Sequence, residues 1–142
     1  MIYSKECEYA IRALTYLSLH PERRCLSREI AEDESLPGFF LSKILQTLAR
    51  ARLLNSVKGP NGGFQLAKSP DEITLFEIRQ ILDGNDDLEA CAVGLGECHG
   101  LTPCPLHESF KPIRDQIKDY LHHTTLELMA RAVQEKQPQP KP

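Results

Sequence analysis

The chain has 142 residues, of which 41% are hydrophobic and 26% are charged, and its formal net charge is −3. These values are typical of one soluble globular domain. No apolar stretch approaches the ~20 residues that a membrane helix needs, and the charged N-terminus is not a signal peptide, so we expect a cytoplasmic protein with no membrane partner. The charge is uneven, because residues 1–68 contain 10 Lys and Arg against 7 Asp and Glu, whereas residues 69–142 contain 7 against 13.

The first third of the chain predicts three helices. Apolar residues recur at helical spacing over 5–19. A second, short helix is expected over 27–34, with Ser27 as its N-cap. Pro37 is placed to open a third helix that continues to about residue 51.

A hairpin and a fourth helix are expected next. Two short strand-like segments, 53–57 and 63–67, are separated by a loop that contains Asn-Gly, a strong signal for a tight hairpin turn. The fourth helix follows a cap at Thr74 and ends near Asp83. Three helices followed by a hairpin is the order of a winged helix-turn-helix.

Residues 108–134 predict one long helix whose apolar side chains form a near-heptad stripe. An isolated helix cannot hide such a stripe, so we expect it to form a homodimer. The polar, Pro-rich tail at 135–142 is expected to be disordered. The stripe consists of Phe110, Ile113, Ile117, Tyr120, Leu121, Thr124 and Leu128.

The predicted fold is therefore mainly α, a winged helix-turn-helix with a small β-hairpin wing and a long C-terminal dimerisation helix. We divide the chain into a DNA-binding domain at 1–84, a cysteine-rich loop at 85–107, the dimerisation helix at 108–134 and the tail at 135–142.

The third helix and the hairpin lie in a stretch, 35–68, that has five basic residues and no acidic one. In a winged helix-turn-helix the third helix enters the major groove and the wing reaches phosphates or the minor groove, so we predict double-stranded DNA as a partner. A winged helix that contacts only proteins is the alternative. The candidate DNA-binding residues are Ser27, Arg28, Phe39, Ser42, Lys43, Gln46, Lys58 and Asn61.

Phe39 and Phe40 are adjacent, and adjacent residues on a helix cannot share one face. We expect one of them in the core. The other either packs on a thymine methyl group or a sugar, or is an ordinary surface aromatic.

Three cysteines, Cys91, Cys98 and Cys104, share one glycine-bearing loop with the spacing C-x6-C-x5-C, and His107 follows. Thiolates are ligands of iron–sulfur clusters and of zinc. Structural zinc sites usually contain closely paired cysteines, which are absent here, so the wide spacing favours a cluster. Unligated thiols that pack or oxidise are the alternative. The remaining two, Cys7 and Cys25, fall on or beside helices and are expected to be packing residues.

Over about residues 1–130 the chain resembles winged-helix iron–sulfur transcriptional regulators of the IscR, NsrR and RirA type. The resemblance is carried by Tyr9-Ala10 and Arg12-Ala13-Leu14, by the segments 40–46 and 58–64, by Glu77-Ile78 and by Cys104-Pro105-Leu106-His107. It departs from the family at Lys58, where the wing often has Arg, and at Ser42, where some members carry an acidic residue.

The resemblance implies a homodimer whose long helices cross at the two-fold axis, with each cysteine loop near the partner's first helix. It implies DNA binding that switches with the state of a [2Fe-2S] or [4Fe-4S] cluster on Cys91, Cys98 and Cys104. The fourth ligand is either His107, one helical turn beyond Cys104, or Glu8, which can act only through folding or across the dimer.

The favoured function is a cluster-sensing DNA-binding regulator. A second hypothesis is a cluster-free thiol switch that responds to cysteine oxidation. The third is a small oxidoreductase, which only the thiols support. The sequence has no nucleotide-binding loop and no nucleophile motif, so we predict neither an enzyme nor a small-molecule substrate.

Overall fold

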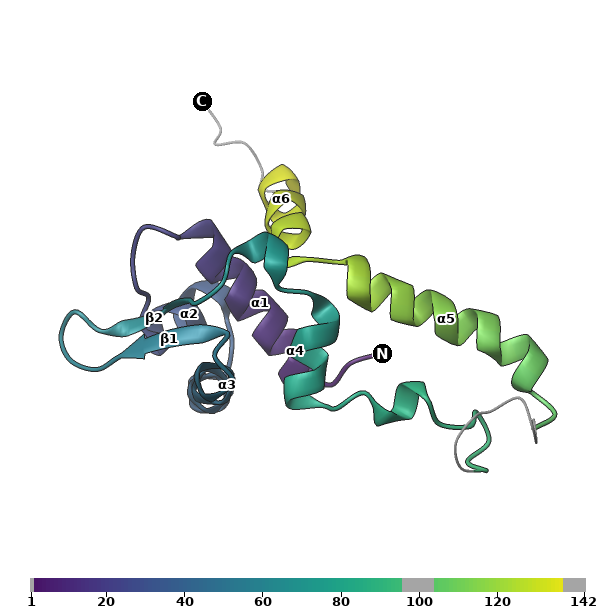
Figure 1. Ribbon diagram of the computed structural model, residues 1–142. Coiled ribbons are helices and arrows are strands. Elements are labelled where there is room, and N and C mark those ends of the chain that lie inside the picture. Colours follow the sequence, from purple (N-terminus) through teal and green to yellow (C-terminus); the bar gives the residue numbers. More distant parts are fainter. Residues whose placement is uncertain (1, 96–103, 137–142) are drawn as a thin grey trace.

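The computed structural model of the protein describes residues 2–95 and 104–136, and it confirms the predicted, mainly helical winged helix-turn-helix (Figure 1). Short 3-10 turns at Pro70–Glu72 and Asp86–Leu88 flank the fourth helix. The helices and strands are α1 (Lys5–Leu19), α2 (Ser27–Glu34), α3 (Gly38–Arg50), β1 (Leu54–Val57), β2 (Gly63–Leu66), α4 (Leu75–Leu82), α5 (His107–His123) and α6 (Leu126–Lys136).

Helix α1 lies at the centre of the core. Its Ala10, Leu14 and Leu17 side chains are almost completely buried, and α3, α4 and α6 pack around them. The Ser4 hydroxyl caps the helix by accepting a hydrogen bond from the backbone N–H of Cys7 at 3.1 Å. The Ser4 hydroxyl in turn donates to Asp83 at the end of α4, so the cap also joins two helices.

The starts of α2 and α3 each differ by one residue from the prediction. Ser27 is the first residue of α2, and Leu26 occupies the N-cap position in an extended conformation without a side-chain cap. Likewise α3 begins at Gly38, and Pro37 is the extended residue before it. The cap predicted at Thr74 is present, since its hydroxyl accepts from the backbone N–H of Glu77 at 3.2 Å.

The wing is an antiparallel hairpin in which Leu54 pairs with Leu66 and Val57 with Gly63. Backbone hydrogen bonds between Phe64 and Cys25, at 2.8 and 2.9 Å, attach the hairpin to the segment before α2. At Gly63 the φ angle is +126°, and a Cβ atom would lie 2.6 Å from the carbonyl oxygen of Cys25. Only glycine fits at this crossing.

The helix predicted over 108–134 is wrong as a single element, because the chain breaks at Thr124 into α5 and α6. The backbone of Thr124 is extended, and its carbonyl accepts from the N–H of Leu75 at 2.9 Å. The N–H of Leu126 then donates to the carbonyl of Ile73 at 3.0 Å. These bonds turn α6 back onto α1. Because α6 packs on α1, the core extends beyond the predicted boundary at residue 84.

The break changes the predicted apolar stripe. Leu121 is completely buried within the chain, and Thr124 is half-buried with its backbone used in the turn. In contrast Ile113, Tyr120 and Leu128 are about half exposed. Ile117 packs partly against the core, and Phe110 has intermediate exposure. Of the predicted tail, residues 135–136 complete α6, and 137–142 lie outside the described residues.

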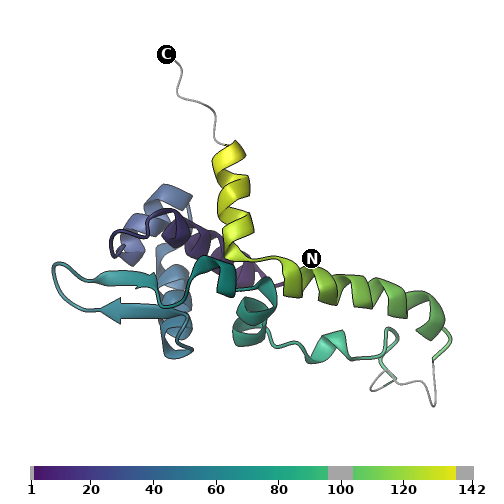
Figure 2. The same ribbon diagram turned by 45° about the horizontal axis from the view of Figure 1, so that its top comes forward.

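Figures 1 and 2 show that the wing and α5 project from the core in opposite directions. The segment that follows α4 leads away from the core alongside α5, so residues 91–95 lie near the start of α5, and α5 then returns to the core. Within the described parts of the chain, no helix is long and apolar enough to cross a membrane.

Candidate functional site

Helix α3 buries one face and exposes the other. Leu41, Leu45 and Leu48 are completely buried, whereas Phe39 is 71% exposed and Phe40 is 55% exposed. The expectation that one phenylalanine enters the core is therefore wrong, because the neighbouring Leu41 takes that position. Two large aromatic side chains thus stand on the surface at the N-terminal end of α3.

The predicted base-reading residues of α3 share this exposed face. Lys43 and Gln46 are exposed, and Ser42 is half-buried. The Lys43 ammonium lies 4.4 Å from the centroid of the Phe39 ring, a cation–π distance. This contact holds a positive charge and an aromatic face together at the position that enters a major groove in this fold.

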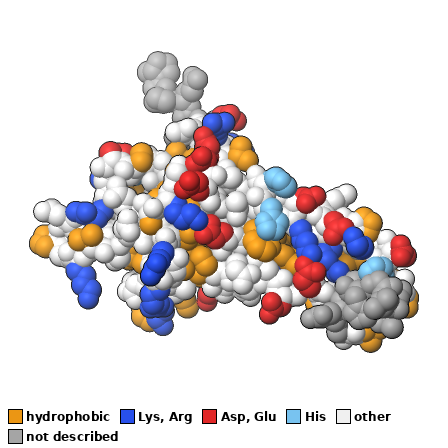
Figure 3. All heavy atoms as spheres, viewed as in Figure 1, with side chains coloured by type: hydrophobic (Ala, Val, Ile, Leu, Met, Phe, Trp, Pro, Cys, Tyr) orange, Lys and Arg blue, Asp and Glu red, His pale blue; other side chains and the backbone are white. Residues whose placement is uncertain are grey.

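The wing and the start of α2 carry the other predicted DNA contacts. Lys58 and Asn61 are exposed on the wing loop, Arg28 is exposed on α2, and Ser27 is half-buried. Figure 3 shows Lys and Arg side chains over the wing and α3, while acidic side chains are spread over the middle of the molecule and α5. The basic stretch at 35–68 therefore lies at one end of the molecule, on α3 and the wing.

A second group of residues forms a corner at the start of α5. The Cys91 sulfur accepts hydrogen bonds from the backbone N–H groups of Val93 and Leu95, which lower the pKa of this thiol below its usual value. A hydrogen bond with the Cys104 thiol acts in the same direction. Both cysteines are free thiols, and Cys91 is buried whereas Cys104 is half-buried. We call residues 89–95 and 104–114 the cysteine corner.

The other predicted ligands are brought to the corner only in part. His107 begins α5, and its backbone N–H donates to the carbonyl of Cys104 at 3.0 Å. Cys98 lies outside the described residues. Glu8 is on α1, whereas the corner lies at the start of α5, and Glu8 pairs with Lys5 at 3.4 Å (Figure 1). Within the described residues, no group of three or more His, Cys, Asp and Glu side chains is arranged to hold a metal ion.

The two other cysteines behave as expected from packing. Cys7 and Cys25 are completely buried. Burial raises the pKa of the Cys7 thiol to about 12, and Asp83 adds to the shift. Burial also raises the pKa of Cys25. Burial thus raises the pKa of both thiols, whereas the surroundings of Cys91 lower the pKa of that thiol.

The comparisons with known proteins agree with this arrangement. Residues 3–132 match the model of the Rrf2 family, described as iron-dependent transcriptional regulators. The chain belongs to the Rrf2 family. A protein of Aquifex aeolicus, named as an HTH-type transcriptional regulator, is 36% identical to it over 128 residues, which are 89% of each chain.

This Rrf2 protein is also similar to two regulators that carry specific names, IscR and CymR. The transcriptional regulator IscR of Vibrio campbellii is 30% identical over 123 residues, which are 85% of this chain and 73% of IscR. The solved structure of CymR, the global cysteine regulator of B. subtilis, matches with a TM-score of 0.71 at 28% identity, and covers 91% of this chain and 95% of CymR. The family consists of DNA-binding transcriptional regulators and not of enzymes, as we predicted.

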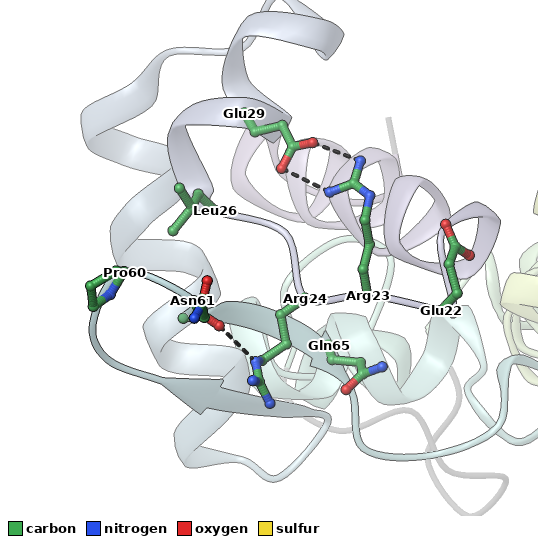
Figure 4. A pocket seen from close by; sticks show the side chains of 9 residues that line it. Glu22, Arg23, Arg24, Leu26, Glu29, Pro60, Asn61 and Gln65 are labelled. Carbon is green, nitrogen blue, oxygen red and sulfur yellow. Dashed lines mark hydrogen bonds and ion pairs between the residues drawn. The ribbon is translucent and has the colours of Figure 1, made fainter.

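The sequence prediction missed one basic residue of this Rrf2 protein. Arg24, in the loop before α2, donates through Nε to the backbone carbonyl of Asn61 on the wing at 3.2 Å. The two residues line a surface cavity of about 470 Å³ between that loop and the wing (Figure 4). The neighbouring Arg23 is neutralised by Glu29 at 2.6 Å, so Arg24 carries the local positive charge. In the sequence, the two adjacent arginines Arg23 and Arg24 in a predicted loop could have indicated this basic position.

Proposed function

We propose that this Rrf2-family regulator is a homodimeric sensor whose binding to double-stranded DNA switches with the state of an iron–sulfur cluster. The observation that carries the proposal is the hydrogen-bonded pair of free thiols, Cys91 and Cys104, in a corner where backbone N–H groups point at Cys91. Such an environment stabilises a thiolate, which is the form of cysteine that binds metals.

The donor chemistry of the corner fits a cluster. Cys91 and Cys104 supply two soft ligands, and Cys98, from the same loop of the sequence, would supply the third. When bound, a cluster supplies a redox centre whose potential depends on hydrogen bonds to the sulfur atoms and on nearby charge. The chain lowers the pKa of the Cys91 thiol, which favours the thiolate, and Arg114 holds the backbone before Cys91 against α5.

We favour His107 over Glu8 as the fourth ligand. His107 lies at the start of α5, hydrogen-bonded through its backbone to Cys104, and a neutral imidazole adds no further negative charge to a thiolate-rich site. Glu8 would reach a corner only as Glu8 of the partner subunit, because α1 of the same chain is near the core (Figure 2). A carboxylate would be a labile ligand, which suits a signal that displaces it.

The proposed dimer uses α5. This helix projects away from the core and leaves Ile113 51% exposed and Tyr120 47% exposed. Apolar side chains on a projecting arm are typical of a subunit interface. Pairing two such arms would hold two copies of α3 in a fixed relation, which a two-fold symmetric operator requires.

The alternative is a cluster-free thiol switch, and the same thiol pair supports it. Hydrogen peroxide would oxidise Cys91 and Cys104 to a disulfide, with two electrons and two protons passing to the peroxide to give two molecules of water. The similarity to CymR, a regulator named for cysteine, favours keeping this function in view.

One experiment separates these functions. The protein is purified without oxygen, its visible spectrum is recorded, and iron and sulfide are counted. The bound and stripped forms are then incubated with a pool of random double-stranded DNA, and the retained sequences are read. We expect a coloured protein that holds iron and sulfide, and an enriched two-fold symmetric sequence for only one of the two forms. A colourless protein whose DNA binding changes with hydrogen peroxide would establish the thiol switch instead.

A further inference from the structure

The cysteine corner contains a buried positive charge. Arg114, in α5, is only 5% exposed. One guanidinium nitrogen donates to the backbone carbonyl of Ala90 at 2.6 Å, and the guanidinium carbon lies 5.2 Å from the centroid of the Phe110 ring. Since Ala90 directly precedes Cys91, the cation is fixed beside the first cysteine of the loop.

No carboxylate in the described parts of the chain pairs with Arg114. The Asp115 carboxyl accepts from Lys111 at 2.7 Å, which together with weaker attraction from Lys118 and Arg114 lowers its pKa, and Glu89 pairs with Lys118. A buried charge without an ion-pair partner is costly, because water is lost and nothing of opposite charge takes its place in direct contact. Among the described residues, Arg114 therefore has no carboxylate in ion-pair contact.

A second arginine shows how this chain treats a buried guanidinium elsewhere. Arg79, in α4, is also 5% exposed. Its guanidinium forms a bidentate ion pair with Asp87 at 2.6 and 3.0 Å, and it donates to the side chain of Asn85 at 2.7 Å. Within the described residues, Arg79 thus has an ion-pair partner and Arg114 has none. The difference indicates that the counter-ion of Arg114 comes from outside the described side chains.

We propose that the counter-ion of Arg114 is the anionic thiolate centre anchored on Cys91 and Cys104, and that Arg114 positions this centre and raises its reduction potential. This inference rests on the proposed iron–sulfur function. Thiolate ligands make such a centre negative, and each electron that it accepts makes it more negative. A fixed cation stabilises the reduced form more than the oxidised form. Arg114 also holds the carbonyl of Ala90, and with it the backbone that carries Cys91.

The test compares three variants with the wild type. Arg114→Gln keeps a donor for Ala90 but removes the charge, and Arg114→Lys keeps the charge. Arg131→Gln, the control, removes a charge from α6, away from the corner, that is already paired with Glu127. Each protein is loaded with ferrous iron and sulfide without oxygen. The bound centre is titrated with dithionite, which donates one electron to it, and the visible absorption is followed.

We expect Arg114→Gln to lower the ratio of reduced to oxidised centre about tenfold at a fixed potential, which is about 59 mV for a one-electron couple. Arg114→Lys should stay close to the wild type, and Arg131→Gln should match it. A second readout uses no cluster: the unfolding temperature of the stripped Arg114→Gln protein should equal or exceed that of the stripped wild type, because an unbalanced buried charge has been removed.

Two outcomes would overturn the inference, and each points to a different cause. If the wild type binds no iron and sulfide, the proposed function fails and this inference fails with it. If the wild type is loaded but Arg114→Gln titrates like the wild type, and its stripped form unfolds at a lower temperature, Arg114 is a structural residue and only this inference fails. Should Arg114→Gln not fold, Arg114→Met carries the same expectation.

Discussion

The DNA-reading end and the cysteine corner project from one core but differ in how they are held. The reading end is anchored by fully buried leucines of α3 and by the backbone link from the wing to Cys25. At the corner, Arg114 and Lys118 of α5 hold residues 89–90, and the two free thiols lie nearby. The reading end is thus fixed mainly by apolar packing, whereas the corner is held by polar contacts and is where we propose that a cluster binds.

Because the two regions are held by different contacts, a signal can act on one of them without reshaping the other. A change at the corner need not reshape α3 or the wing, because those elements are fixed by their own packing. It can act through α5, which joins the corner to the core and carries the proposed dimer surface. The following predictions test whether the two regions can be altered separately.

The largest expected effect is the loss of the proposed cluster on replacing Cys91 by Ser. The variant should hold no iron or sulfide and show no visible absorption, because a serine hydroxyl is not deprotonated at neutral pH and binds iron poorly. The unfolding temperature of the stripped form should be unchanged. Cys25→Ala is the control, since Cys25 packs at the reading end and its loss should leave the colour intact. A coloured Cys91→Ser protein would contradict the ligand assignment.

Charging the exposed side of α5 should separate the subunits. Ile113→Glu places a carboxylate at a half-exposed apolar position, and burying it in a dimer would cost several kcal/mol. Light scattering should report a monomer that has lost most of its affinity for a two-fold symmetric DNA site. Gln116→Glu, at an exposed position of the same helix, should leave the dimer intact. A variant that stays dimeric would place the interface elsewhere.

The apolar pattern of the first half of the chain was sufficient to predict the fold, because burial there follows helical spacing closely. Leu14 and Leu17 in α1 recur at that spacing, as do Leu45 and Leu48 in α3, and all four are almost completely buried. The break at Thr124 could not be seen, since the apolar stripe continues through Leu128 as if the helix did. What ends the helix is a pair of backbone bonds to the segment before α4, which depends on tertiary contact.

The candidate sites were predictable to different degrees. The exposed residues of α3 and the wing follow from the basic stretch, and the cysteine loop from its spacing. The exposure of both Phe39 and Phe40 was missed, because the sequence does not say which of three consecutive apolar residues faces the core. The sequence does not predict the burial of Arg114, since an arginine on an amphipathic helix usually lies in solvent.

A smaller, uniform loss of DNA affinity is expected for the wing. Lys58→Ala removes one positive charge from the exposed wing loop, so the slope of log affinity against log salt should fall by about one, with a similar loss for every DNA sequence. Lys136→Ala, at the far end of α6, is the matched control and should change neither quantity. An unchanged salt slope for Lys58→Ala would remove the wing from DNA contact.

The smallest expected effect concerns the ion pair of Arg79, the buried arginine that has a carboxylate partner. The Arg79 guanidinium holds the pKa of the Asp87 carboxyl below its usual value. The stabilisation is therefore present above the unfolded pKa, about 3.9, and is lost as the pH falls through the lower folded value. Asp87→Asn should lower the free energy of unfolding by about 1 kcal/mol at neutral pH, because Asp87 is largely exposed. Chemical denaturation should show the difference shrinking as the pH falls below the unfolded pKa.

The backbone link between Phe64 and Cys25 fixes the wing strand β2 to the loop before α2. In the proposed dimer, the position of one wing and α3 relative to the other would then be set by two variables, the separation and the rotation of the subunits. The regulator would then discriminate between operators by the phase of their half-sites, so that inserting half a helical turn, about 5 base pairs, places the second half-site on the opposite side of the DNA.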